Sequence, residues 1–183
     1  MTISPRILGV FLVLAAGPAC GVAAAADHSP AAEAPKMVRI RPGTARLASL
    51  VNVGLARSAS LRKLVASIEK TDGIVFIEEG RCPRGVAACL TWQVTAAGGY
   101  RLLFVVIDTG RTARDVVASV GHELQHVLEV LGDPSLRTTH AIHLFYMSGM
   151  SPEGPRAVET AAAEAAGNAV FREFGRPHSA ERE

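Results

Sequence analysis

Hydrophobic residues along the central part of the chain follow two different periods. Between residues 47 and 70 they recur at spacings of three and four, which predicts a helical stretch. Runs rich in β-branched and aromatic residues then predict short strands at 74–77, 90–94 and 100–107. Because Gly98 and Gly99 separate the last two runs, those strands are expected to form a hairpin.

From residue 112 onward the helical period dominates. Thr112 and Asp115 form a capping-box pattern with Asp in place of the usual Glu, and Pro155 suits the first turn of a last helix. Helices are therefore expected at 112–131, 135–147 and 155–174. Together these elements predict an α+β fold. In it, a short mixed or antiparallel sheet of about three strands packs on the helix 112–131 and is followed by further helices.

The first 26 residues have the pattern of a secretory signal peptide. Arg6 precedes an apolar run at 7–16, and small residues then lead to Ala26. The run is too short to span a bilayer, so cleavage near Ala26 and export to the periplasm or the medium are expected. Acylation of Cys20 in a lipoprotein is the less favoured alternative, because the Gly-Pro pair near it makes a poor lipobox.

The rest of the chain is expected to form one domain with two flanks. Residues 27–45 are rich in Ala and Pro and are expected to form a flexible mature N-terminus. Residues 46–175 are expected to form the domain, and residues 176–183 a polar tail.

The net charge of the mature chain is close to zero. The leader holds one of the 19 basic residues and no acid, which leaves 18 basic against 17 acidic residues, a net charge of +1. No block of like charge stands out, so nucleic acid is not expected as a partner. No integral membrane segment is expected in the mature chain, and the oligomeric state stays open.

Two cysteines remain after the leader, Cys82 and Cys89. An exported protein meets an oxidising compartment, so a disulfide that closes this short loop is expected. The alternative is a pair of free or metal-binding thiols. It is disfavoured because no further cysteine is present to complete a thiolate site.

The segment 122–126 reads His-Glu-Leu-Gln-His. His122 and His126 are four residues apart, so on a helix they lie about 40° apart on one face, where both rings can reach one metal ion. Glu123 is then placed to hold a water molecule rather than to ligate. A chance match to this motif is expected in about 1% of chains of this composition. The segment therefore predicts one zinc ion bound by both histidines, with Glu123 as the catalytic base.

The two histidines could instead belong to a solvated helix face. An apolar stripe lies opposite them, and their own side of the helix is polar. The same geometry fits a helix whose back packs on the sheet and whose front lines a cleft. Periodicity does not separate these cases, and the specificity of the motif favours the cleft. The stripe consists of Val117, Val120, Leu124, Val127 and Leu131, and the polar side also carries Asp115, Ser119 and Glu129.

A catalytic zinc site needs a third protein ligand, and the last predicted helix offers Glu159. On a helical wheel this acid falls on the small, apolar side with Ala163 and Val170, where an unpartnered carboxylate is costly. A metal ion would remove that cost, and a buried salt bridge to Arg156 is the alternative. Other candidates for the third ligand are Glu164, His140 and His143.

The motif at 122–126, with Glu159-Thr160 downstream on an alanine-rich helix, resembles the gluzincin metallopeptidases. The likeness is to their small members and to exported bacterial proteins with a Gly-His-Glu-Leu-Gln-His segment, and it covers about residues 61–174. It implies a zincin-like catalytic domain in which His122, His126 and Glu159 bind zinc and Glu123 is the general base. Many gluzincins have an Asp four residues beyond the Glu ligand, where this chain has Ala163. The groups that orient the histidines are therefore left unassigned.

The function expected on this basis is a zinc-dependent hydrolase, specifically a metallopeptidase acting on a peptide or protein substrate. By resemblance, the substrate would lie extended beside the strand 100–107 or its hairpin partner. His143 and Tyr146 are expected either to stabilise a developing oxyanion or to be packing residues. The alternative is an exported zinc-binding protein without turnover, which a closed site with a fourth ligand from His140 or His143 would indicate.

Overall fold

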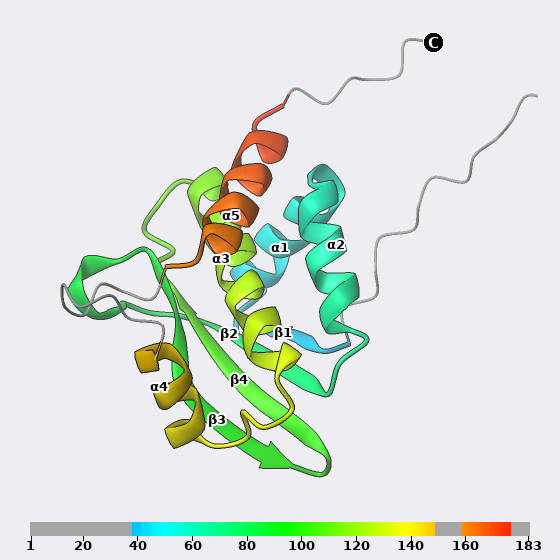
Figure 1. Ribbon diagram of the computed structural model, residues 1–183. Coiled ribbons are helices and arrows are strands. Elements are labelled where there is room, and N and C mark those ends of the chain that lie inside the picture. Colours follow the sequence, from blue (N-terminus) through cyan, green and yellow to red (C-terminus); the bar gives the residue numbers. More distant parts are fainter. Residues whose placement is uncertain (1–37, 149–158, 177–183) are drawn as a thin grey trace, which may run out of the picture. The chain divides into compact units, whose positions relative to one another are not determined.

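The computed structural model describes residues 38–148 and 159–176, in which helices pack on a single four-stranded sheet (Figure 1). The predicted α+β fold class is confirmed. The leader expected at 1–26 and residues 177–183 of the expected tail lie outside the described residues. In chain order the elements are β1 (Ile40–Pro42), α1 (Ala45–Arg57), α2 (Ala59–Ile68), β2 (Gly73–Glu79), the 3₁₀ turn η1 (Pro83–Gly85), β3 (Ala88–Ala97), β4 (Tyr100–Ile107), α3 (Ala113–Gly132), α4 (Thr139–Ser148) and α5 (Ala161–Phe174).

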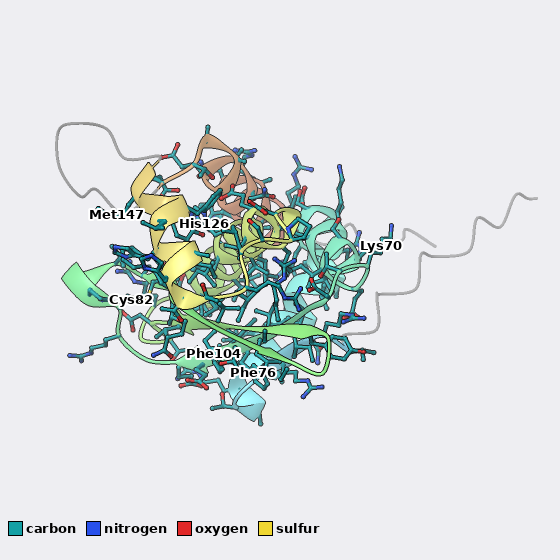
Figure 2. The ribbon with its side chains drawn as sticks, turned by 60° about the horizontal axis from the view of Figure 1, so that its bottom comes forward. Lys70, Phe76, Cys82, Phe104, His126 and Met147 are labelled. Carbon is teal, nitrogen blue, oxygen red and sulfur yellow. A yellow bond between two sulfur atoms is a disulfide. The ribbon has the colours of Figure 1, made fainter. Side chains whose placement is uncertain are left out.

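The sheet has the strand order β1-β2-β4-β3, in which β1, β2 and β4 are parallel and β3 runs antiparallel to β4. Side chains alternate along the inner strands, so that Val75 and Leu103 are fully buried in the core. On the other face, half-buried Phe76 and Phe104 stack with ring centroids 5.3 Å apart (Figure 2). The predicted β3–β4 hairpin is present, and of its two strands β4 is interior while β3 forms an edge of the sheet.

Helix α3 contacts β3 and β4, and α5 packs along α3 (Figure 1). Glycines allow the two helices to approach closely. A Cβ added at Gly121 would lie 2.6 Å from Val170 Cγ2, and one added at Gly167 would lie 3.1 Å from His122 Cβ. The motif helix and the last helix are therefore near enough to contribute side chains to one site.

The close contact at Gly121 makes a first testable prediction. In Gly121→Ala the new methyl group would have to displace Val170 or the backbone of α5, and overpacking of this kind costs about 1–3 kcal/mol of unfolding free energy. Denaturant titration measures the loss, and adding Val170→Ala should recover part of it. Gly132→Ala is the matched control, since an added Cβ there meets nothing within 4 Å. Equal losses in both single variants would contradict the packing argument.

Besides the last helix, which begins at Ala161 rather than at 155, three elements differ from the predicted pattern. The helical stretch 47–70 is divided at Ser58, whose hydroxyl accepts from Leu61 N to cap α2 and donates to Glu173 of α5. β1 lies within 27–45, the segment predicted to be flexible, because residues 40–42 pair with β2. The middle helix begins at Thr139 rather than at 135. Each difference depends on a residue distant in sequence or on a helix cap. The spacing of hydrophobic residues carries no information on either.

Arg101 is a charged residue at a buried position of β4, with 2% of its surface exposed. Its guanidinium donates to the carboxylate of Asp72 and to three carbonyl oxygens at the end of α3, those of Val130, Leu131 and Asp133. Carbonyls at a helix C-terminus lack helical partners, and the helix dipole favours a positive charge there. Arg101 therefore fastens the C-terminal end of the motif helix to the sheet.

Cys82 and Cys89 form the predicted disulfide, with Cα atoms 6.0 Å apart. The disulfide closes the loop that leads into β3, and it indicates an oxidising environment. Within the described ranges, no helix is both long and apolar enough to cross a membrane.

Candidate metal centre

The motif side of α3 is covered by protein rather than by solvent. The apolar stripe on the back of the helix is buried as predicted. On the front, Glu123 and His126 are only 5% and 6% exposed, and the side chain of His122 keeps 23% of its surface exposed. Because α5 and β3 pack against this helix, the motif residues line an interior wall. The interpretation as a solvated helix face is therefore excluded.

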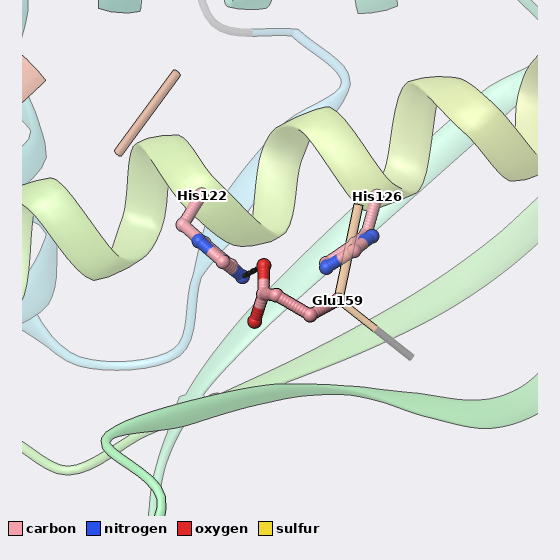
Figure 3. Close-up of side chains that lie close together, drawn as sticks. All are labelled: His122, His126 and Glu159. Atoms are coloured by element: carbon pink, nitrogen blue, oxygen red, sulfur yellow. Dashed lines mark ion pairs between the residues drawn. The ribbon is translucent and has the colours of Figure 1, made fainter. Parts of the chain in front are cut away.

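His122, His126 and Glu159 each offer one ligand atom, and these atoms all lie within 4.8 Å of one another (Figure 3). His122 Nε2 is 3.2 Å from Glu159 Oε1, and the two imidazole centroids are 5.0 Å apart. In a tetrahedral zinc site with bonds of about 2.0–2.1 Å, neighbouring ligand atoms are about 3.3 Å apart. Small side-chain rotations would thus bring two imidazoles and a carboxylate onto one metal ion.

The protonation of His122 favours this role. Burial lowers the pKa of its imidazole, and the nearby charge of His126 lowers it further. A neutral ring carries the lone pair that a metal ion needs. His122 could therefore bind a metal ion without first losing a proton at neutral pH.

Glu159 reaches the site from a different local structure than predicted. Helix α5 begins at Ala161, and Glu159 immediately precedes its N-cap, Thr160. The expectation that Glu159 lies on the apolar side of a helix starting near Pro155 is therefore wrong. Its side chain is 42% exposed, and burial of the remainder raises the pKa of its carboxyl. Arg156, the alternative salt-bridge partner, lies outside the described residues.

Glu129 belongs to the site as well, although the sequence identifies it only as one of several residues on the polar side of α3. Its Oε2 lies 2.9 Å from His126 Nδ1, and its Oε1 accepts a hydrogen bond of 2.6 Å from Thr160 Oγ1. Its spacing of three residues from His126 on a helix is the signal that could have found it, since such pairs face each other. Because this chain has Ala163 where many gluzincins have an Asp, the sequence left open which group orients the histidines. For His126, the carboxylate of Glu129 is placed to do so.

Glu123 lies between the histidines and the edge strand. Its Oε2 accepts a 2.6 Å hydrogen bond from Leu90 N in β3, and its Oε1 lies 4.0 Å from His122 Nε2. Burial raises the pKa of Glu123 to about 7, against the opposing effects of His126 and of the Leu90 hydrogen bond. A carboxyl with a pKa near neutrality can both take up and return a proton at neutral pH.

No protein-family model, curated protein or solved structure matches this chain. What the site can do must therefore be inferred from its own residues. The site combines three potential metal ligands, the adjacent buried carboxylate of Glu123 and a cleft beside them.

The cleft has a volume of about 560 Å³, within the range of small-ligand sites. Its lining comes from α3, from α5 and the preceding Glu159, and from residues 86–88, which lead into β3. Most of the lining side chains are small, which leaves room for an occupant next to His122 and Glu123. The lining residues include Val86, Ala87, Ala88, Ala118, Ser119, Gly167, Asn168 and Phe171.

Other predicted candidates take different places. The hydroxyl of Tyr146 is buried without a hydrogen-bond partner in the described structure, and its ring centroid lies 6.4 Å from that of His126. Burial raises the pKa of Tyr146, so the hydroxyl keeps its proton at neutral pH and can donate it. His143 packs against Trp92 with centroids 4.7 Å apart, and His140 is exposed. Glu164 lines the cleft but does not belong to the three-residue group.

Proposed function

We propose that the protein is a zinc-dependent hydrolase acting on peptides or proteins. The observation that carries the proposal is the group of His122, His126 and Glu159 beside the buried Glu123, facing an open cleft. Imidazole nitrogen and carboxylate oxygen are ligands that suit zinc. Three protein ligands leave a coordination position for water or substrate, which is the pattern of catalytic rather than structural zinc sites.

The chain's own residues suit the steps of such a reaction. Zinc bound here would supply a water of lowered pKa and polarise the scissile carbonyl. Glu123 would accept the proton of the attacking water and return it to the leaving amine, while the Leu90 N–H holds one of its oxygens in place. Tyr146, a protonated donor whose hydroxyl has no hydrogen-bond partner among the described residues, would donate to the developing oxyanion.

The edge strand β3 limits where an extended peptide could bind. Beyond Leu90 the pairing with β4 is irregular up to Val94, and the N–H of Val94 donates to Thr139 Oγ1 at the start of α4. A substrate strand would therefore add to the first part of β3, around Ala88, directly beside the cleft. The strand 100–107, the other predicted substrate edge, is interior and is not available.

A zinc-binding protein without turnover is the second candidate. It would require a closed site, with a fourth protein ligand such as His140 or His143. In the described residues neither histidine joins the three-residue group, and the His143 ring packs edge-on against Trp92. This arrangement favours the open site and therefore the hydrolase.

Metal analysis tests the proposed site. The purified chain is expected to hold one zinc ion per molecule, and His122→Ala and Glu159→Ala are each expected to lose it. Glu164→Ala removes an acid from the same cleft but not from the ligand group, so this control should retain the metal. Zinc retained in Glu159→Ala would place the third ligand elsewhere, and absence of zinc from the wild-type chain would overturn the proposal.

Turnover needs a separate measurement. The zinc-loaded chain should cleave members of a mixed peptide library, with products identified by mass spectrometry, and a chelator should stop the cleavage. Stoichiometric zinc without any cleavage would favour the binding protein.

A further inference from the structure

Glu129 connects the two parts of the chain that carry the candidate ligands. One carboxylate oxygen meets His126 on α3 and the other meets Thr160, the residue after Glu159. We propose that Glu129 is the positioning residue of the metal centre, selecting the reactive form of His126 and fastening the Glu159 segment to α3. This inference rests on the proposed zinc site.

The first half of the inference concerns the proton on His126. An ionised carboxylate only accepts hydrogen bonds, so Nδ1 of His126 must carry the hydrogen that it shares with Glu129 Oε2 over 2.9 Å. A neutral ring with its hydrogen on Nδ1 has its lone pair on Nε2. Figure 3 shows one ring nitrogen of His126 turned toward Glu159, on the side of the ligand group. Glu129 thus holds the tautomer and the ring orientation that metal binding requires.

The second half of the inference concerns Glu159. Its side chain is 42% exposed, so packing around the carboxylate does not by itself hold it in place. Thr160 anchors the adjacent backbone twice. Its Oγ1 donates to Glu129 and accepts from Ala163 N at 3.1 Å, as the N-cap of α5. A hydroxyl has one hydrogen to donate, and Thr160 donates it to Glu129.

Glu129 itself is not a ligand in this arrangement. Both of its oxygens are engaged, and its side chain is only 19% exposed. It lies behind His126 and beside Thr160. Removing such an outer carboxylate from a zinc site costs about 10–100-fold in metal affinity.

The experiment compares Glu129→Ala, Thr160→Val and Thr160→Ser with the wild-type chain. Zinc affinity is measured by competition with a chromogenic chelator, and the tautomer of His126 by ¹⁵N NMR of the ring in the metal-free protein. Glu129→Ala should weaken zinc binding by about 10–100-fold and should mix the two tautomers. Thr160→Val should weaken zinc binding while the Nδ1–H tautomer persists, and Thr160→Ser, which keeps the hydroxyl, should resemble the wild type.

Denaturant titration of the metal-free variants shows whether each still folds, so a loss of affinity in a folded variant is assigned to the site. Unchanged zinc affinity and an unchanged His126 tautomer in folded Glu129→Ala would overturn the inference. If the wild-type chain binds no zinc, the proposed function fails instead, and the tautomer measurement still decides the role of Glu129 toward His126. Equal affinities of Thr160→Val and wild type would overturn the link to Glu159.

Discussion

Replacing Glu123 by Gln is expected to remove peptide hydrolysis while leaving the zinc in place. The amide has nearly the shape of the carboxylate, and its oxygen can still accept the hydrogen bond from Leu90 N. It cannot accept a proton from water or pass one to a leaving amine. Loss of a general acid–base group lowers kcat by about 10²–10⁴-fold, which cleavage assays on a peptide from the library can resolve.

The control for this variant is Glu164→Gln, which neutralises another acid of the same cleft. If cleavage depends on Glu123 as a base, Glu164→Gln should retain most of the activity and both variants should retain stoichiometric zinc. Full activity of Glu123→Gln would refute the mechanism. Loss of zinc from this variant would show that Glu123 acts as a ligand instead.

Arg101→Ala is expected to cause a large loss of stability. It would remove the Arg101 hydrogen bonds from three carbonyls at the end of α3, and it would leave Asp72 with only its exposed partner Arg137. Leaving a buried carbonyl without its donor costs about 1–3 kcal/mol of unfolding free energy for each such group. Denaturant titration measures this loss, and Arg101→Lys, which keeps the charge but not the planar donor geometry, should fall between Arg101→Ala and the wild type.

Arg137→Ala is the matched control, because Arg137 also pairs with Asp72, at 3.2 Å, but is 42% exposed. Exposed pairs of this kind contribute about 0–1 kcal/mol. Similar losses for the two arginine-to-alanine variants would contradict the role given to Arg101 in fastening α3.

Acid should weaken the same anchor. Burial raises the pKa of Asp72, but the hydrogen bond and charge of Arg101 outweigh this and lower it below 3.8 in the folded protein. A folded-state pKa below the unfolded one stabilises the fold where the group is ionised in both states, which is above about pH 5. The contribution is lost as the pH falls through 3.8 toward the lower folded value.

The parts of the fold that the sequence predicts well are those encoded locally. Helix α3 follows from an unbroken apolar stripe and from Thr112, whose hydroxyl accepts from Asp115 N as the capping pattern indicates. The disulfide follows from two cysteines and an expected oxidising compartment. His122, His126 and Glu123 follow from spacing on that one helix.

The parts that the sequence does not predict depend on partners distant along the chain. A helical wheel selects Glu159 as a ligand, yet this residue precedes the helix and meets His122 because α5 packs on α3. Arg101 lies in a strand that reads as apolar, and its guanidinium finds its acceptors in Asp72 and at the end of another element. Local periodicity contains no information on either contact.

The free edge of β3 also bears on solubility. An unpaired strand edge can add a strand from another copy of the same chain, which is the first step of many aggregation reactions. Here two edge N–H groups are already occupied by side chains, that of Leu90 by Glu123 and that of Val94 by Thr139. The irregular pairing between these two residues interrupts the edge further. These contacts therefore oppose the addition of a strand from another copy along the middle of this edge, and they confine strand addition to the first part of β3, where the proposed substrate would bind.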